Sequence, residues 1–135
     1  MRTKFIHVTD PHLAPSGQTL CTLDPAARLR MVVEDVNRLH GDADALFLTG
    51  DVAYKGLEAG YKLAHEILSE LRIPYHLLIG NHDDRTAFKR TFPETPLDDA
   101  GFVQYVIDHA VGSLIVLDTV RHGEEDLSLI HISEP

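Results

Sequence analysis

Three short motifs in the chain combine aspartate, asparagine and histidine, residue types that bind divalent metals and transfer protons. They are Asp10-Pro11-His12, Gly50-Asp51 and Gly80-Asn81-His82-Asp83. Hard and borderline divalent cations accept carboxylate, amide oxygen and imidazole ligands together. The chain also has nine histidines, and histidine is both the commonest metal ligand and a frequent acid or base. The motifs therefore predict a metal site.

The three motifs differ in how easily they arise by chance. A chain of this composition should contain Asp-x-His about once by chance. A Gly-Asp pair is also common, and the second copy, Gly41-Asp42, is explained by a turn. Gly80-Asn81-His82-Asp83 is expected in only about 10⁻³ copies. A turn in which Asp83 caps the next helix would account for the aspartate, but it leaves the histidine unexplained.

The apolar segments predict the elements that position these motifs. Three short strands each end at one motif, and helices separate the strands. The first helix begins at Pro25, with Asp24 as its N-cap and Gly41 where a C-terminal cap belongs. By range, strands are expected over 4–9, 45–49, 75–79, 103–107 and 114–117, and further helices over 61–71 and 84–90.

The order β-α-β-α-β predicts a mainly parallel sheet with right-handed crossovers and helices packed outside it. Parallel strands end at one edge of the sheet, where ligands of such folds bind. We therefore expect Asp10 and His12 after the first strand, Asp51 after the second, and Asn81 and His82 after the third to meet at that edge.

Composition limits the class of protein. A chain of 135 residues is the size of one domain, and its formal charge of −9 argues against a broad grip on nucleic acid or an anionic membrane. Phosphate chemistry remains open because bound metal ions can reverse the sign of a site. With Cys21 as the only cysteine, no membrane-length apolar run and no signal-peptide pattern, we expect a cytoplasmic protein.

In their order and spacing, the three motifs resemble those of the calcineurin-like metallophosphoesterases, over residues 5–119. Residues 50–85 are most similar to the bacterial glycerophosphodiesterase and class III cyclic-nucleotide phosphodiesterase branch. The resemblance implies an α/β fold, the incomplete N-terminal part of a four-layer α/β/β/α sandwich. In the protein serine/threonine phosphatase branch, the second motif reads Gly-Asp-x-Val-Asp-Arg-Gly and the third motif ends in glutamate. In this chain, residues Gly50 to Gly56 read GDVAYKG and the third motif ends in Asp83.

The resemblance also implies a site with two divalent metal ions, for which manganese, iron, zinc and cobalt are all suitable. Asp10 and His12 would hold the first ion, Asp51 would bridge both, and Asn81 would bind the second. Two ions carry more positive charge than the two aspartates neutralise, so the site would attract a phosphodiester and lower the pKa of bound water. The nucleophile would then be a metal-bound hydroxide.

Two residues of the third motif would act without binding metal. His82 would lie beside the phosphate and either stabilise its charge or protonate the leaving oxygen, and Asp83 would support the ligands. The expected activity is hydrolysis of a small-molecule phosphodiester, either a glycerophosphodiester or a 3′,5′-cyclic nucleotide, with no nucleic acid polymer or membrane as partner. The alternatives are a phosphomonoesterase or nuclease of the same superfamily, and a binding module that keeps the fold without catalysis.

The chain lacks part of the family's ligand set. The family has three further histidines downstream, two of them in Gly-His-x-His, a motif that does not occur here. Residues 127–135 match the translation of a transposase-based sequencing adapter, so we expect residues 1–126 to be a truncated domain and residues 127–135 to be foreign. His131 is then excluded, His122 is ambiguous, and the chain by itself is expected to be inactive. Of the remaining histidines, His7 and His76 are expected to be packed within strands and His40 to be structural at a helix end. His65 is expected on the surface and His109 at a turn.

Overall fold

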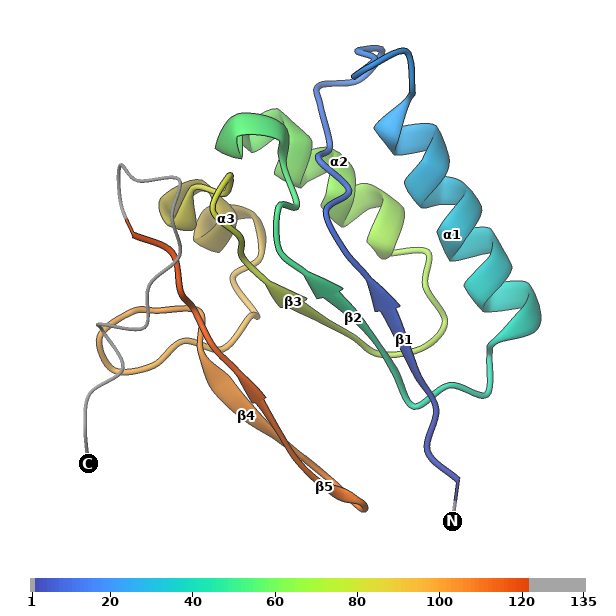
Figure 1. The fold of residues 1–135 in the computed structure, drawn as a ribbon, viewed down its shortest axis with the longest axis vertical. Coiled ribbons are helices and arrows are strands. Elements are labelled where there is room, and N and C mark those ends of the chain that lie inside the picture. Colours follow the sequence, from blue (N-terminus) through green and yellow to red (C-terminus); the bar gives the residue numbers. More distant parts are fainter. Residues whose placement is uncertain (1, 122–135) are drawn as a thin grey trace.

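The computed structural model (Figure 1) describes residues 2–121. The adapter interpretation of residues 127–135, and the roles of His122 and His131, lie outside the described residues. None of the described helices is both long enough and apolar enough to cross a membrane.

A three-stranded parallel sheet forms the centre of the structure. Its strands are β1 (Phe5–Val8), β2 (Ala45–Thr49) and β3 (Tyr75–Leu78), in the order β1-β2-β3. Val8 pairs with Leu48, and Thr49 pairs with Leu78, so the carboxyl ends of the three strands lie at one edge. The prediction of a mainly parallel α/β sheet is confirmed, and β2 has the predicted bounds.

Helix α1 (Pro25–Leu39) begins as the sequence predicts, because the Asp24 side chain accepts a hydrogen bond from the Ala27 backbone N–H at 3.1 Å. Its end differs from the prediction. The C-cap is His40, whose backbone N–H donates to the Val36 carbonyl at 2.9 Å. The φ angle of Gly41 is not positive, so Gly41 does not form the left-handed cap that glycine commonly supplies.

Helix α2 (Glu58–Leu68) follows a short 3₁₀ turn, η1 (Tyr54–Gly56), and packs beside α1. Arg30 of α1 pairs with Glu66 of α2 at 2.8 Å. The helix ends three residues before the predicted Leu71, because the Leu71 N–H bonds to the Leu68 carbonyl in a tighter turn that leads into β3. Leucine, valine and isoleucine side chains from both helices and the sheet form the core, and full burial of each contributes about 1.5–3 kcal/mol.

The opposite face of the sheet carries aromatic side chains. The rings of Phe5 and Phe47 lie 5.4 Å apart, and Phe47 stacks on His76 at 5.2 Å. A two-stranded antiparallel hairpin of β4 (Tyr105–His109) and β5 (Gly112–Val116) joins this side through a 3.0 Å bond from the Tyr105 hydroxyl to the Leu77 carbonyl. In Figure 1 the three strands lie between α1 and this hairpin. The complete four-layer sandwich stays an expectation of the family.

Candidate metal centre

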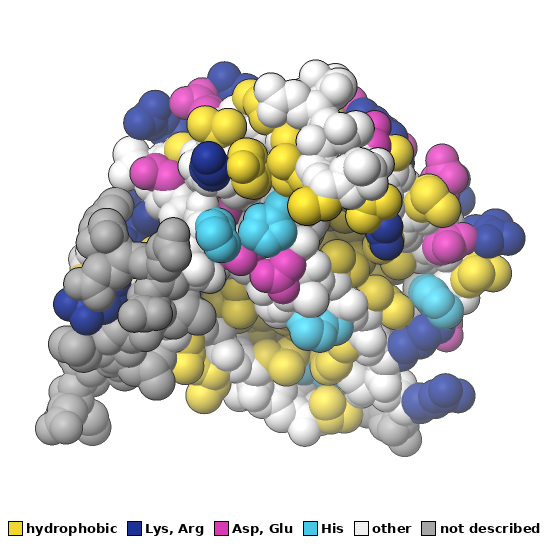
Figure 2. Space-filling view, turned by 45° about the horizontal axis from the view of Figure 1, so that its top comes forward, with side chains coloured by type: hydrophobic (Ala, Val, Ile, Leu, Met, Phe, Trp, Pro, Cys, Tyr) yellow, Lys and Arg dark blue, Asp and Glu magenta, His cyan; other side chains and the backbone are white. Residues whose placement is uncertain are grey.

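Asp10, His12 and Asp51 come together at the carboxyl edge of the sheet. Each offers one ligand atom, and these atoms lie within 4.8 Å of one another. His12 Nε2 is 3.6 Å from Asp51 Oδ2. Asp51 is buried, His12 is partly buried and Asp10 is exposed, so the group opens to solvent on one side. Figure 2 shows histidine and acidic side chains gathered on this face.

Backbone pairing beyond the strands fixes the distance between the first two motifs. The His12 N–H donates to the Asp51 carbonyl at 2.9 Å, and the Leu13 N–H donates to the Val52 carbonyl at 2.9 Å. The Tyr54 N–H returns a bond to the Leu13 carbonyl at 2.9 Å. The loops after β1 and β2 therefore run side by side, and their acidic side chains are held near each other by the main chain.

Three residues of the candidate site have left-handed backbone conformations. Their φ angles are +51° at Asp10, +45° at His12 and +47° at Asp51. Residues other than glycine adopt this region at a cost of order 1–3 kcal/mol, and such conformations cluster at functional sites. The paired loops supply the hydrogen bonds that hold this strain in place.

The third motif reaches the same edge through its backbone. The His82 N–H donates to Asp51 Oδ1 at 3.0 Å, and the His82 ring lies edge-on to the His12 ring, with 5.3 Å between centroids. The His82 side chain is exposed. Asn81 is partly buried and lies between Gly80 and His82, both of which approach Asp51. The structure thus brings all five predicted residues to one edge.

The close approach of the third motif depends on Gly80. A Cβ atom at this position would lie 2.3 Å from Asp51 Oδ1 and 2.6 Å from the Asp51 backbone nitrogen. Gly50, which has φ +89°, lies on the other side of the same contact, where an added Cβ would come within 3.1 Å of the Gly80 Cα. The glycines of the second and third motifs therefore allow two loop backbones to touch beneath the ligands.

Changing Gly80 to alanine should push the Asp51 carboxylate out of place. We expect metal affinity of the full-length protein to fall by about 10–100-fold, the usual result of disturbing the groups that orient a ligand. Titration calorimetry with Mn²⁺ measures this. The matched control is Gly41→Ala, where the new Cβ meets only the Asn37 carbonyl at 3.6 Å. Wild-type Mn²⁺ affinity in the Gly80 variant would contradict the prediction.

Asp83 ties together the loops that carry the ligands. Burial raises the pKa of the Asp83 carboxyl, while its hydrogen bonds favour the ionised form. The hydroxyl of Tyr61 donates to Asp83 and accepts from the Asp84 N–H at 2.8 Å. A carboxylate with four donors around it is fixed in position. The donors are Gly80 N (2.8 Å), Tyr61 Oη (2.9 Å), Val52 N (3.1 Å) and Ala53 N (3.1 Å).

The structure corrects one interpretation of Asp83. The residue that caps α3 (Arg85–Thr91) is Asp84, which accepts from the Ala87 N–H at 2.7 Å. Asp83 points into the protein instead. The sequence predicts a helix over 61–71 but gives no sign of the role of the Tyr61 hydroxyl, whose burial raises its pKa and keeps it protonated. Helical periodicity carries no signal for such a contact.

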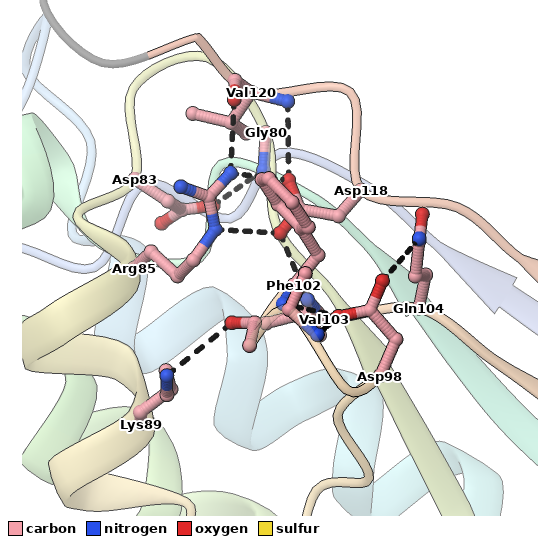
Figure 3. Close-up of polar contacts among 12 residues, drawn as sticks. Gly80, Asp83, Arg85, Lys89, Asp98, Phe102, Val103, Gln104, Asp118 and Val120 are labelled. Carbon is pink, nitrogen blue, oxygen red and sulfur yellow. Dashed lines mark hydrogen bonds and ion pairs between the residues drawn. The ribbon is translucent and has the colours of Figure 1, made fainter. Parts of the chain in front are cut away.

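A buried ion pair lies directly after the third motif (Figure 3). The Arg85 guanidinium donates to both Asp118 carboxylate oxygens, at 2.7 and 2.8 Å, and to the Val120 carbonyl at 2.9 Å. Burial alone would raise the pKa of Asp118, but its bonds to Arg85 and to the N–H groups of Val103 and Val120 lower it. This pair joins the motif to the segment after β5, and sequence reasoning did not predict it.

The remaining described histidines lie outside the metal-binding group. His7 Nε2 lies 2.6 Å from the Thr49 hydroxyl, and burial lowers the pKa of His76. His65 packs against Phe92, with 5.4 Å between ring centroids, and His109 Nε2 lies 3.5 Å from an Asp44 carboxylate oxygen. His40 lies at the end of α1, as its C-cap.

The donor set of the candidate site fits a divalent cation. Two carboxylates and one imidazole converge, and within residues 2–121 no lysine or arginine forms an ion pair with Asp10 or Asp51. The Thr9 hydroxyl donates to the Asp10 carboxylate, which leaves that charge in place. Oxygen and imidazole ligands of this kind suit manganese, iron, cobalt and zinc.

The parallel sheet of this α/β fold has acidic and histidine side chains at its carboxyl edge that could hold a metal ion. The chain belongs to the calcineurin-like phosphoesterase family, whose sequence profile matches residues 3–132. This agrees with the resemblance seen in the three motifs.

The chain is similar to three proteins whose names give a phosphodiesterase activity. A "probable cyclic nucleotide phosphodiesterase" of Rhodopseudomonas palustris is 41% identical over 89% of this chain and 44% of its own length. A glycerophosphodiester phosphodiesterase of Enterobacter lignolyticus is 31% identical over 87% of the chain and 44% of its own length. A cAMP/cGMP dual specificity phosphodiesterase of Mycobacterium tuberculosis is 29% identical over 89% of the chain and 40% of its own length. The chain therefore spans less than half the length of these relatives.

Proposed function

We propose that the full-length protein containing this chain is a metal-dependent phosphodiesterase for small molecules, either glycerophosphodiesters or 3′,5′-cyclic nucleotides. The observation that carries the proposal is the convergence of Asp10, His12 and Asp51 ligand atoms within 4.8 Å. Membership of the calcineurin-like phosphoesterase family and the names of the relatives support the substrate class.

We assign two divalent ions to the site. Asp10 and His12 hold one, Asp51 is shared between both, and Asn81 holds the second. The position of Asp51 supports sharing, since one oxygen faces His12 and the other faces the loop that carries Asn81. When bound, such ions act as Lewis acids on phosphate oxygens and lower the pKa of water.

His82 is the side chain we assign to the substrate. It is exposed, and its ring lies beside that of His12, so it can reach a phosphate held at the ligand group. There it balances negative charge or gives a proton to the leaving oxygen. Besides its role as a ligand, Asp51 holds the His82 backbone. Asp83 holds the neighbouring loops and acts by positioning.

The test is a substrate panel with the purified full-length protein and Mn²⁺. We expect hydrolysis of bis(p-nitrophenyl) phosphate and of a natural small diester, lost with a chelator and restored by Mn²⁺. Preference for p-nitrophenyl phosphate would instead indicate a phosphomonoesterase, and cleavage of DNA would indicate a nuclease. Absence of both metal binding and turnover would indicate a binding module. The 135-residue chain alone should be inactive, and Mn²⁺-dependent turnover that Asp51→Ala abolishes would contradict this.

A further inference from the structure

A cavity of about 700 Å³ opens beside the ligand group. Asp10 and His12 form part of its wall, and most of the other lining residues come from residues 19–23 and the first turns of α1. Figure 2 shows a hollow lined by hydrophobic side chains next to the histidine and acidic side chains. A phosphate held by the ligands would thus direct one of its organic substituents into this space.

The walls of the cavity are mostly apolar. Leu20, Leu29 and Val32 are among the lining residues, and Tyr54 adds an aromatic side chain. The aliphatic side chains offer no hydrogen bonds to the hydroxyl groups of a glycerol substituent, which is also far smaller than the cavity. Sites of 300–1,000 Å³ with apolar walls and a few polar groups suit larger, partly flat ligands.

Arg28 supplies a cation in this cavity. It lies in the first turn of α1 and lines the cavity, and its guanidinium forms no hydrogen bond or ion pair with residues 2–121. Arg30, two positions along the same helix, differs because it pairs with Glu66 and Glu70 at 2.8 and 3.6 Å. A planar guanidinium stacks on flat rings and donates two parallel hydrogen bonds to O6 and N7 of guanine.

We propose that this cavity binds the nucleoside part of a 3′,5′-cyclic nucleotide and that Arg28 contacts its base. The inference rests on the proposed phosphodiesterase function, and it selects the cyclic nucleotide over the glycerophosphodiester. Arg28 is then a specificity residue, with no part in the chemical step.

The first experiment compares substrates in the Mn²⁺-loaded full-length protein. Arg28→Ala should raise the KM for 3′,5′-cyclic GMP at least about fivefold, the lower end for a bidentate arginine contact to guanine. The values of kcat/KM for bis(p-nitrophenyl) phosphate and glycerophosphocholine should stay within about twofold of wild type, since neither carries a base. Arg28→Lys keeps the charge but loses the planar guanidinium. Its KM for the cyclic nucleotide should therefore lie between those of the wild type and Arg28→Ala. Arg30→Ala is the matched control and should leave the KM for the cyclic nucleotide unchanged.

The second experiment uses Cys21, which is exposed and lines the cavity, as a reporter. The rate of its alkylation by iodoacetamide is followed by mass spectrometry of the Cys21 peptide. A 5′-nucleotide should slow alkylation in the Mn²⁺-loaded full-length protein. Glycerol 3-phosphate has the same phosphate group and should not protect at equal concentration. Arg28→Ala should weaken protection by the nucleotide.

The two proposals fail in different ways. If the wild-type protein hydrolyses no phosphodiester, the proposed function is wrong, whatever the Cys21 result. If it hydrolyses diesters but Arg28→Ala changes all substrates alike or none, the proposed function stands and the nucleoside cavity is wrong. Equal protection of Cys21 by the nucleotide and by glycerol 3-phosphate, or protection by neither, also overturns the inference.

Discussion

Replacing Asp51 with asparagine should remove metal binding and phosphodiesterase activity from the full-length protein while leaving the fold intact. Asparagine keeps an oxygen that can accept the His82 N–H now bonded to Asp51 Oδ1 at 3.0 Å, so the loop contact survives. The change removes one negative charge from the buried side of the ligand group. Because Asp51 is a proposed direct ligand, we expect metal affinity to fall by at least about 100-fold. That value is the upper end of the range for residues that only orient a metal ligand.

Metal content by elemental analysis and Mn²⁺ titration measure this effect, and thermal unfolding checks the fold. The control is Asp42→Asn, which makes the same chemical change at the other Gly-Asp pair. Asp42 is mostly exposed and bonds Lys4 at the sheet's opposite end, so metal binding should be unaffected. Wild-type Mn²⁺ affinity in the Asp51 variant would remove Asp51 from the proposed site.

Replacing Asp118 with alanine should destabilise the protein by about 3–5 kcal/mol, the cost of leaving a buried charge without its partner. Arg85 and Asp118 have side-chain exposures of 10% and 0%, so water cannot readily replace the lost carboxylate. The N–H groups of Val103 and Val120 lose their acceptor in the same change. Urea unfolding of the full-length protein measures the loss of unfolding free energy.

The exposed pair of Arg38 and Asp35, which is also short at 2.6 Å, provides the control. Asp35→Ala should change the unfolding free energy by less than about 1 kcal/mol, because exposed ion pairs contribute little. A double change, Arg85→Met with Asp118→Leu, should recover part of the loss by replacing the pair with apolar contacts. If Asp118→Ala costs no more than Asp35→Ala, the buried pair does not stabilise the protein.

The contribution of Asp118 to the unfolding free energy should also depend on pH. Its folded-state pKa is lower than the unfolded value of about 4. The stability that it contributes is therefore fully present above that value and is lost as pH falls towards the folded-state pKa. The difference in unfolding free energy between wild type and Asp118→Ala should be largest near neutral pH and should shrink below about pH 4.

Local patterns were enough to predict the elements that carry the site. The apolar runs ending at Asp10, Asp51 and Asn81 became three parallel strands with a common edge, because alternation with helices permits few topologies. The start of α1 was also predictable, since the Asp24 cap bonds a backbone N–H three residues away. Helix ends were less accurate at Gly41 and Leu71, where the turn into the following strand decides the last residue.

The sequence by itself determined which residue types follow each strand and hence which chemistry can gather at the sheet edge. Only the tertiary structure decided how Asp51 is held, how Tyr61 and Asp83 meet, and that Arg85 pairs with Asp118. It alone also placed Arg28 in a cavity beside Asp10. The physical reason is range: period and capping depend on neighbours within a few residues, whereas Tyr61 and Asp83 are 22 residues apart and Arg85 and Asp118 are 33 apart. Such partners meet only after the chain has packed.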